Sequence, residues 1–406
     1  MVAAFVPTEQ KPEPPKAFPV TRECVGNTLG ALAGMAVLPG HLDRPTWLAD
    51  DGEAASPLLM SFTNGLLDVD AMLQGKRDVL NEHSARWFTE TAYPYAFDPK
   101  ADCPKWKSAI GRILEDDADR IALVRQWFGY CLLPDTSQQR FLMLVGEGSN
   151  GKSVVCAAQA AVLGPANVSA VPLEAFAQRF ALTTTLGRLA NIAAEVGELD
   201  KAAEGVLKSF TSGDRMLFDR KNLQPVEAMP TARLILATNN PPRFADRSSG
   251  IWRRMLLVPF RVIIPESERV YGMDKPAWWE ASGELPGILN WSLAGLHDLQ
   301  QRGRFTEPSL CVEELQQYRE ESNPARMFLI DHYKAAEEGL VKTADVYEGY
   351  RKWCEQNGYR PLGDRSFGKE VHRAFPSTRR QRLGGRLERH WFYVGLDLGE
   401  NNTSTL

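Results

Sequence analysis

Residues 140–161 read RFLMLVGEGSNGKSVVCAAQAA, and the rest of the chain is arranged around them. Residues 141–145 form an unbroken apolar run, which is typical of a parallel strand buried on both faces. Apolar residues recur at helical spacing after Ser153, and Gly164-Pro165 ends that pattern. A strand, a glycine loop and a helix in this order predict a phosphate-binding loop.

The loop, GEGSNGKS at residues 146–153, fits the pattern G-x-x-x-x-G-K-[ST]. Its glycines let the backbone curl, so that N–H groups and the helix N-terminus face a polyphosphate. We expect Lys152 to reach the β- and γ-phosphates and Ser153 to ligate Mg²⁺, so the predicted ligands are ATP and Mg²⁺. The alternative is a chance turn, which the flanking pattern disfavours. The candidate binding residues are Gly146, Glu147, Gly148, Ser149, Asn150, Gly151, Lys152 and Ser153.

Two later apolar runs end in polar residues suited to hydrolysis. Residues 188–194 run into Glu195, with Glu198 close behind, and a Walker B element needs a carboxylate at such a strand end to meet Mg²⁺ and the attacking water. Residues 231–238 run into Asn239, which can hold that water or sense the γ-phosphate. The plain alternatives are a surface strand that ends in glutamate and a simple Asn-Asn-Pro-Pro turn.

Two basic pairs stand out beyond the first strand. Arg220 and Lys221 lie in a segment, residues 215–230, that predicts either an exposed β-hairpin or a solvated loop. Arg253 and Arg254 precede an apolar strand at residues 255–260. They are either surface charges or a source of an arginine finger for a neighbouring subunit.

Composition narrows the class of protein. The chain has 406 residues, 44% hydrophobic and 24% charged, with a net charge of −4, which suits two or three globular domains without a global positive field. No apolar run approaches the roughly 20 residues of a membrane span, and the N-terminus lacks a signal-peptide layout. The six cysteines form no C-x-x-C pair, which predicts free thiols in a reducing compartment, the cytoplasm.

The segments around the loop predict several further domains. Residues 1–20 are a proline-rich, disordered arm, and residues 21–135 form a small α-rich domain with a hairpin at 58–69 and helices at 106–114 and 117–131. The ATPase core is expected at residues 136–265. Residues 266–335 are expected to form a helical lid or connector that packs on it.

Residues 340–396 predict a winged-helix-like domain, because two helical patterns, at 343–356 and from Ser366 to about 375, precede a Gly-tipped basic turn and a strand. Residues 360–390 hold nine arginines and lysines against three acidic residues, which indicates a phosphate-binding patch. The alternatives are a solvated basic surface and a wing that docks a protein. The candidate DNA contacts here are Arg379, Arg380, Arg382 and Arg386.

Taken in order, GEGSNGKS, AAEVGE, LKSFTSGD and RLILATNNPPRFADRSSGIWRRMLLVPF resemble a superfamily 3 helicase of the phage and plasmid primase-helicase branch, related to the poxvirus-type NTPase. The preceding stretches SFTNGLLDVD and YPYAFDPKADCPKW are similar to the small domain before the ATPase in that branch. The resemblance covers roughly residues 58–265, with a weaker match near 340–396.

The resemblance implies an α/β, AAA+-like hexameric ring that translocates on single-stranded DNA. By position, Glu195 matches the Walker B acid and Asn239 the sensor asparagine. The finger lies in the Arg253-Arg254 pair, with Arg254 the first choice, and Arg220 and Lys221 fall on a DNA-contacting hairpin in the ring channel. The chain departs from the family in the spacing of Glu195 and Glu198, which leaves their metal and base roles open. It also shows no primase module, so a primase is expected as a separate or upstream partner.

We therefore predict an ATP-dependent replicative helicase of a phage, plasmid or integrated element. One alternative is an ATP-dependent initiator or loader that binds duplex DNA through residues 340–396 without unwinding it. A P-loop small-molecule kinase is a third possibility, which the finger arginines and the basic C-terminal domain disfavour.

Overall fold

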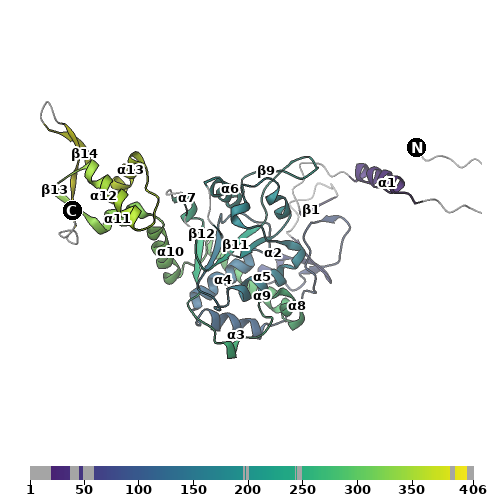
Figure 1. Ribbon diagram of the computed structural model, residues 1–406. Helices are drawn as coiled ribbons and strands as arrows, with labels where there is room; N and C mark the ends of the chain where they lie inside the picture. Colours follow the sequence, from purple (N-terminus) through teal and green to yellow (C-terminus); the bar gives the residue numbers. More distant parts are fainter. Residues whose placement is uncertain are drawn as a thin grey trace, which may run out of the picture.

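The computed structural model describes residues 20–36, 45–48, 59–194, 197, 201–242, 244, 249–384 and 389–399. Except for Val20, the proline-rich arm predicted for residues 1–20 lies outside these ranges. The chain forms a large α/β core and a smaller C-terminal domain that projects from one side of it, beyond helix α10 (Ser309–Glu321) (Figure 1).

A five-stranded parallel sheet organises the core, in the order β12-β6-β11-β8-β7. The apolar runs of the sequence become its central strands, so the strands predicted at 141–145, 188–194, 231–238 and 255–260 are confirmed. Because β11 lies between β6 and β8, residues that follow β11 lie between the P-loop and the end of β8. The strand bounds are β6 (Phe141–Val145), β7 (Val168–Ser169), β8 (Ala190–Ala194), β11 (Arg233–Thr238) and β12 (Met255–Pro259).

A helix and a β-hairpin connect β8 to β11 along the chain. Helix α6 (Lys201–Ser212) ends at Gly213, and an antiparallel hairpin of β9 (Met216–Phe218) and β10 (Val226–Ala228) follows it. The β-hairpin predicted around Arg220 and Lys221 is therefore confirmed, since both residues lie between its strands.

The region before the P-loop shares one hydrophobic core with the helices that follow the sheet. The predicted hairpin is β2 (Leu59–Phe62) with β3 (Gly65–Asp68), and the predicted helices are α3 (Pro104–Ile113) and α4 (Ala118–Tyr130). Their buried side chains form a continuous cluster with α5 (Lys152–Leu163), α8 (Pro276–Ser282) and α9 (Leu285–Arg302). Trp106, Trp127 and Trp279 are fully buried in it.

Helices α4 and α9 touch backbone to backbone. A Cβ added at Gly295 would lie 2.1 Å from the carbonyl oxygen of Arg125, and one added at Gly129 would lie 2.4 Å from that of Ser292. No side chain larger than hydrogen fits at either position, so these glycines set the spacing of the two helices.

The carboxylate of Glu284, which precedes α9, caps the N-terminus of α3. Glu284, just before α9, is 5% exposed and accepts from the backbone N–H groups of Lys105 and Trp106, at 2.9 Å each. These are among the first N–H groups of α3, which have no partner within the helix, and a negative charge is favourable there. Glu284 thereby fixes α3 against α9.

The C-terminal domain combines three helices with a three-stranded antiparallel sheet of order β13-β15-β14. Its own core includes Phe328, Tyr350 and Phe367, so α11, which the sequence analysis assigned to the connector, packs inside this domain. The second predicted helix begins at Asp364, two residues before Ser366, with Gly363 as its N-cap. The bounds are α11 (Pro324–His332), β13 (Tyr333–Lys342), α12 (Thr343–Gln356), α13 (Asp364–Ala374), β14 (Arg379–Leu383) and β15 (His390–Leu398).

The remaining helices and strands are short or peripheral. They are α1 (Arg22–Met35), β1 (Thr46–Trp47), α2 (Val69–Leu73), β4 (Leu80–Asn81), β5 (Trp87–Phe88) and α7 (Ser249–Trp252).

Candidate nucleotide site

The loop after β6 has the geometry of an anion cradle. Gly151 has a φ of +92°, and a Cβ there would lie 2.5 Å from the side chain of Ile113 in α3. A Cβ at Gly146 would lie 2.3 Å from the carbonyl oxygen of Phe260. The loop is thus wedged between α3 and the end of β12, and it delivers the chain directly into the N-terminus of α5, where backbone N–H groups favour an anion.

Lys152 lies at the centre of this loop. Its Nζ donates to the carbonyl oxygens of Gly146 at 2.6 Å and Glu147 at 2.9 Å, and to Oδ1 of Asn150 at 3.1 Å. Burial lowers the pKa of Lys152. These oxygens hold the ammonium over the curled loop, where it can pair with a phosphate.

A cavity of about 1100 Å³ opens beside the loop, at the carboxyl ends of the parallel strands. Residues 148–154 form one wall, and Ala194 of β8 and Asn239 after β11 form another. Asn239 is exposed, as a residue that contacts a ligand must be. Glu195 and Glu198 lie outside the described residues, but Ala194, which precedes Glu195, lines the cavity.

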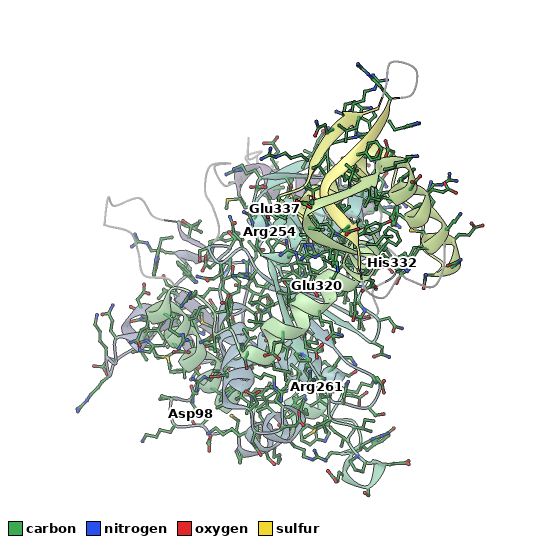
Figure 2. The ribbon with its side chains drawn as sticks, turned by 90° about the vertical axis from the view of Figure 1, so that its left-hand side faces the viewer. Asp98, Arg254, Arg261, Glu320, His332 and Glu337 are labelled. Carbon is green, nitrogen blue, oxygen red and sulfur yellow. The ribbon has the colours of Figure 1, made fainter. Side chains whose placement is uncertain are left out.

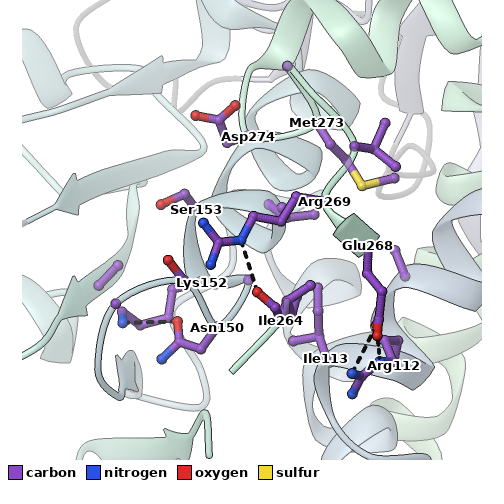
Figure 3. Close-up of a pocket in the computed structure, with 18 of the residues that line it drawn as sticks. Arg112, Ile113, Asn150, Lys152, Ser153, Ile264, Glu268, Arg269, Met273 and Asp274 are labelled. Carbon is purple, nitrogen blue, oxygen red and sulfur yellow. Dashed lines mark hydrogen bonds and ion pairs between the residues drawn. The ribbon is translucent and has the colours of Figure 1, made fainter. Parts of the chain in front are cut away.

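The opposite wall comes from residues that the sequence analysis did not single out. Arg269 lines the cavity, its Nε donates to the carbonyl oxygen of Ile264 at 2.9 Å, and its guanidinium points toward the side where Lys152 and Ser153 lie (Figure 3). Among the described residues it has no ion-pair partner. No motif marks Arg269, because it lies in an irregular loop after β12. Only its place soon after a buried strand of the sheet could have indicated it.

The same loop is tied to its neighbours on two sides. The N–H of Ile264 donates to the carbonyl oxygen of Ser149 at 2.9 Å, and Arg112 of α3 pairs with Glu268 at 3.0 Å. The wall that carries Arg269 is therefore held against both the P-loop and α3.

The arginine pair lies at the other end of the sheet. The carbonyl oxygen of Arg254 accepts from the N–H of Phe141, the first residue of β6, whereas the P-loop follows the last. Five strand residues separate these ends, about 17 Å, which is beyond the reach of an arginine side chain. In Figure 2, Arg254 lies in the upper part of the molecule, far from Asp98 in its lower part.

The two arginines of the pair differ in their surroundings. Arg254 is 9% exposed and donates to the carbonyl oxygen of Gly250 and to Oγ of Ser212, at 2.6 Å each. Burial and the neighbouring Arg253 lower its pKa, although a guanidinium stays charged at neutral pH. Arg253 is exposed, and within the described part of the chain it has no ion-pair partner.

The β9–β10 hairpin presents basic and apolar groups together. Lys221 is exposed at its tip, and the Nε of Arg220 donates to the carbonyl oxygen of Gln224 at 2.9 Å. Leu217 and Leu223 are each 64% exposed. The tip is therefore positive, with apolar side chains beside its charges.

Arginines of the C-terminal sheet are also exposed. Arg379, Arg380 and Arg382 lie on the edge strand β14, and alternation places Arg380 and Arg382 on one face. The guanidinium of Arg380 stacks over the ring of Trp391, 5.1 Å from its centroid. Arg386 lies outside the described residues.

Two protein-family models match separate parts of the chain. Residues 144–254 match a family of unknown function, DUF5906, and residues 322–400 match the RFX DNA-binding domain. The second range includes α11, in agreement with the packing of that helix.

Two individual relatives match different shares of the chain. The chain is 23% identical over 323 residues to the "Putative helicase L207/L206" of Acanthamoeba polyphaga mimivirus, which covers 74% of this chain and 33% of that protein. It is 33% identical over 94 residues to the DNA-binding protein Rfx5 of Mus musculus, or 23% of this chain and 13% of that protein. The chain thus spans about a third of the first relative and far less of the second.

Among solved structures, the apo NrS-1 C-terminal region aligns with 74% of this chain and 77% of its own, at 12% identity and a TM-score of 0.48. None of the helices within the described ranges has the length and apolar character to cross a membrane.

Proposed function

We propose that this chain is an ATP-dependent DNA helicase of the superfamily 3, AAA+-like type that works in replication of a phage, plasmid or other mobile element. The observation that carries the proposal is the cavity shared by the Lys152 loop and Asn239 at the carboxyl ends of the sheet. The similarity to a mimivirus protein named as a helicase supports the same reading.

In this proposal ATP lies along the cavity. Lys152 and Arg269 pair with its phosphates, and the loop N–H groups surround them. Mg²⁺ suits the hydroxyl of Ser153 together with Glu195, because both supply oxygen ligands, and it would neutralise charge on the phosphates. Asn239 holds the attacking water, and Glu195 or Glu198 polarises it.

The arginine pair supports an oligomer. Because about 17 Å of strand separates it from its own P-loop, an arginine of this pair that acts on ATP would act on that of a neighbouring subunit. We propose a closed ring, a hexamer, with Arg253 as the finger. The burial and hydrogen bonds of Arg254 suit a residue that supports the finger loop, so the geometry favours Arg253 over our first choice.

Two surfaces are proposed to contact DNA. The β9–β10 hairpin, with Arg220 and Lys221, would follow single-stranded DNA in the channel, where its exposed leucines can pack against bases. The C-terminal domain, winged-helix-like in its three helices and basic edge hairpin, would bind DNA through Arg380 and Arg382. The match of residues 322–400 to the RFX DNA-binding domain supports this second surface.

The same match favours a second candidate function, an initiator or loader that grips duplex DNA without unwinding it. A forked DNA with a fluorescent strand separates the two. Strand release that requires ATP and is lost in Lys152→Ala supports the helicase. DNA-stimulated hydrolysis without strand release, with retained duplex binding, supports the initiator. Adding a primase tests whether such a partner changes either activity.

A further inference from the structure

The cavity is longer than a triphosphate requires. Its residues on α3 begin at Ile113, which touches Gly151 of the P-loop, and continue along one face of the helix through Ala109 to Lys105. Eight residues of helix rise about 12 Å. The cavity therefore extends well beyond the phosphate-binding loop.

The far end of the cavity is marked by aromatic side chains. The ammonium of Lys105 lies 5.9 Å from the ring centroid of Trp278, which is half-buried. A Cβ added at Gly272 would lie 3.6 Å from Trp278, so the turn that holds Tyr271 abuts the same ring. Tyr271 lines the cavity and is 100% exposed.

The turn beneath Tyr271 is held in place. The N–H of Met273 donates to Val270 at 3.2 Å, and that of Lys275 donates to Gly272 at 2.9 Å. The indole N–H of the fully buried Trp279 donates to the carbonyl oxygen of Met273 at 2.9 Å. A fixed backbone thus carries a phenol ring that packs against none of the residues that the structure describes.

We infer that this end of the cavity is a base-stacking subsite, in which the ring of Tyr271 stacks on the base of the nucleoside triphosphate whose phosphates the P-loop binds. The inference rests on the proposed ATP site and names the part of it that recognises the base. Stacking accepts any base because every base has a π-face. Purines, with their larger rings, bind more tightly than pyrimidines here.

Calorimetric titration with two ligands, ATP and inorganic tripolyphosphate, tests the subsite in the full chain. Only ATP has a base, so Tyr271→Ala should weaken ATP binding at least about fivefold, the lower bound of a typical stacking contribution, and leave tripolyphosphate binding unchanged. Tyr271→Phe keeps the ring and should bind ATP as the unaltered chain does. Ile263→Ala is the matched control, because Ile263 is 64% exposed in the same loop but does not line the cavity.

The remaining outcomes separate the subsite from the P-loop. If Tyr271→Ala binds ATP as tightly as the unaltered chain, or loses both ligands equally, the base does not stack on Tyr271 and the inference is wrong. Lys152→Ala should lose affinity for both ligands. If the unaltered chain binds neither, the P-loop assignment fails and the subsite with it.

Discussion

Replacing Arg253 by alanine should abolish ATP hydrolysis while leaving the fold and nucleotide binding intact. The side chain is exposed and lies at the end of the sheet away from its own P-loop, so its loss disturbs neither the core nor the subunit's own phosphates. An arginine finger is typically worth about 10³- to 10⁵-fold in rate. Turnover should fall by that factor, with an unchanged dissociation constant for ATP.

Arg254→Ala is the matched control, with a different expected result. It removes two hydrogen bonds of 2.6 Å from a guanidinium that is 9% exposed. Hydrogen bonds to charged groups contribute about 1.5–3 kcal/mol each, and truncation also relieves desolvation, so we expect the free energy of unfolding to fall by about 3 kcal/mol. Thermal unfolding should distinguish this loss of stability from the catalytic loss in Arg253→Ala.

The decisive assay mixes Arg253→Ala with Lys152→Ala, each inactive alone. In a mixed ring some interfaces pair an intact P-loop from one variant with an intact finger from the other, and those interfaces should hydrolyse ATP. If the mixture stays inactive after subunit exchange, the finger does not act between subunits. Full activity of Arg253→Ala alone would show that Arg253 is not the finger.

Three further changes test the nucleotide site and the basic surface of the C-terminal domain. Lys152→Ala should reduce ATP turnover by about 10²-fold or more, because electrostatic stabilisation of the transferred phosphate is lost, and a folded variant with normal turnover would remove the P-loop assignment. Arg269→Ala should weaken both ATP and tripolyphosphate by about tenfold, as the loss of one charge-assisted hydrogen bond predicts; unchanged tripolyphosphate binding would contradict its role. Changing Arg380 and Arg382 together to glutamine should make the salt dependence of duplex DNA binding shallower by about 2, since each phosphate contact contributes about 0.9 to the slope, and basal hydrolysis should not change. Arg379→Gln, on the opposite face of β14, should leave the slope as it was.

The sequence predicts those parts of the fold that a short local pattern determines. Residues 141–145 and 234–237 are continuous apolar runs, as strands buried on both faces require, and the P-loop has a fixed spacing. Lys152 follows from that spacing, and Asn239 follows from its place directly after an apolar strand.

Other features depend on contacts between distant segments, which no local pattern records. Arg269 faces the cavity because Ile264 is bonded to Ser149 and Glu268 to Arg112. Arg253 and Arg254 are adjacent in sequence, and only the burial of one separates their roles. The ten-residue strand β13 was missed because its exposed edge carries polar residues without clear alternation.

The glycine contacts between α4 and α9 also determine how the chain can be divided. Since Gly129 and Gly295 bring the two backbones together, the segment before the P-loop and the helices after the sheet belong to one folding unit, although more than 150 residues separate them. A fragment that begins at β6 would leave the apolar face of α9 without its partner and should aggregate. An ATPase fragment that folds must begin before β2, and the C-terminal domain can be detached cleanly only ahead of α11.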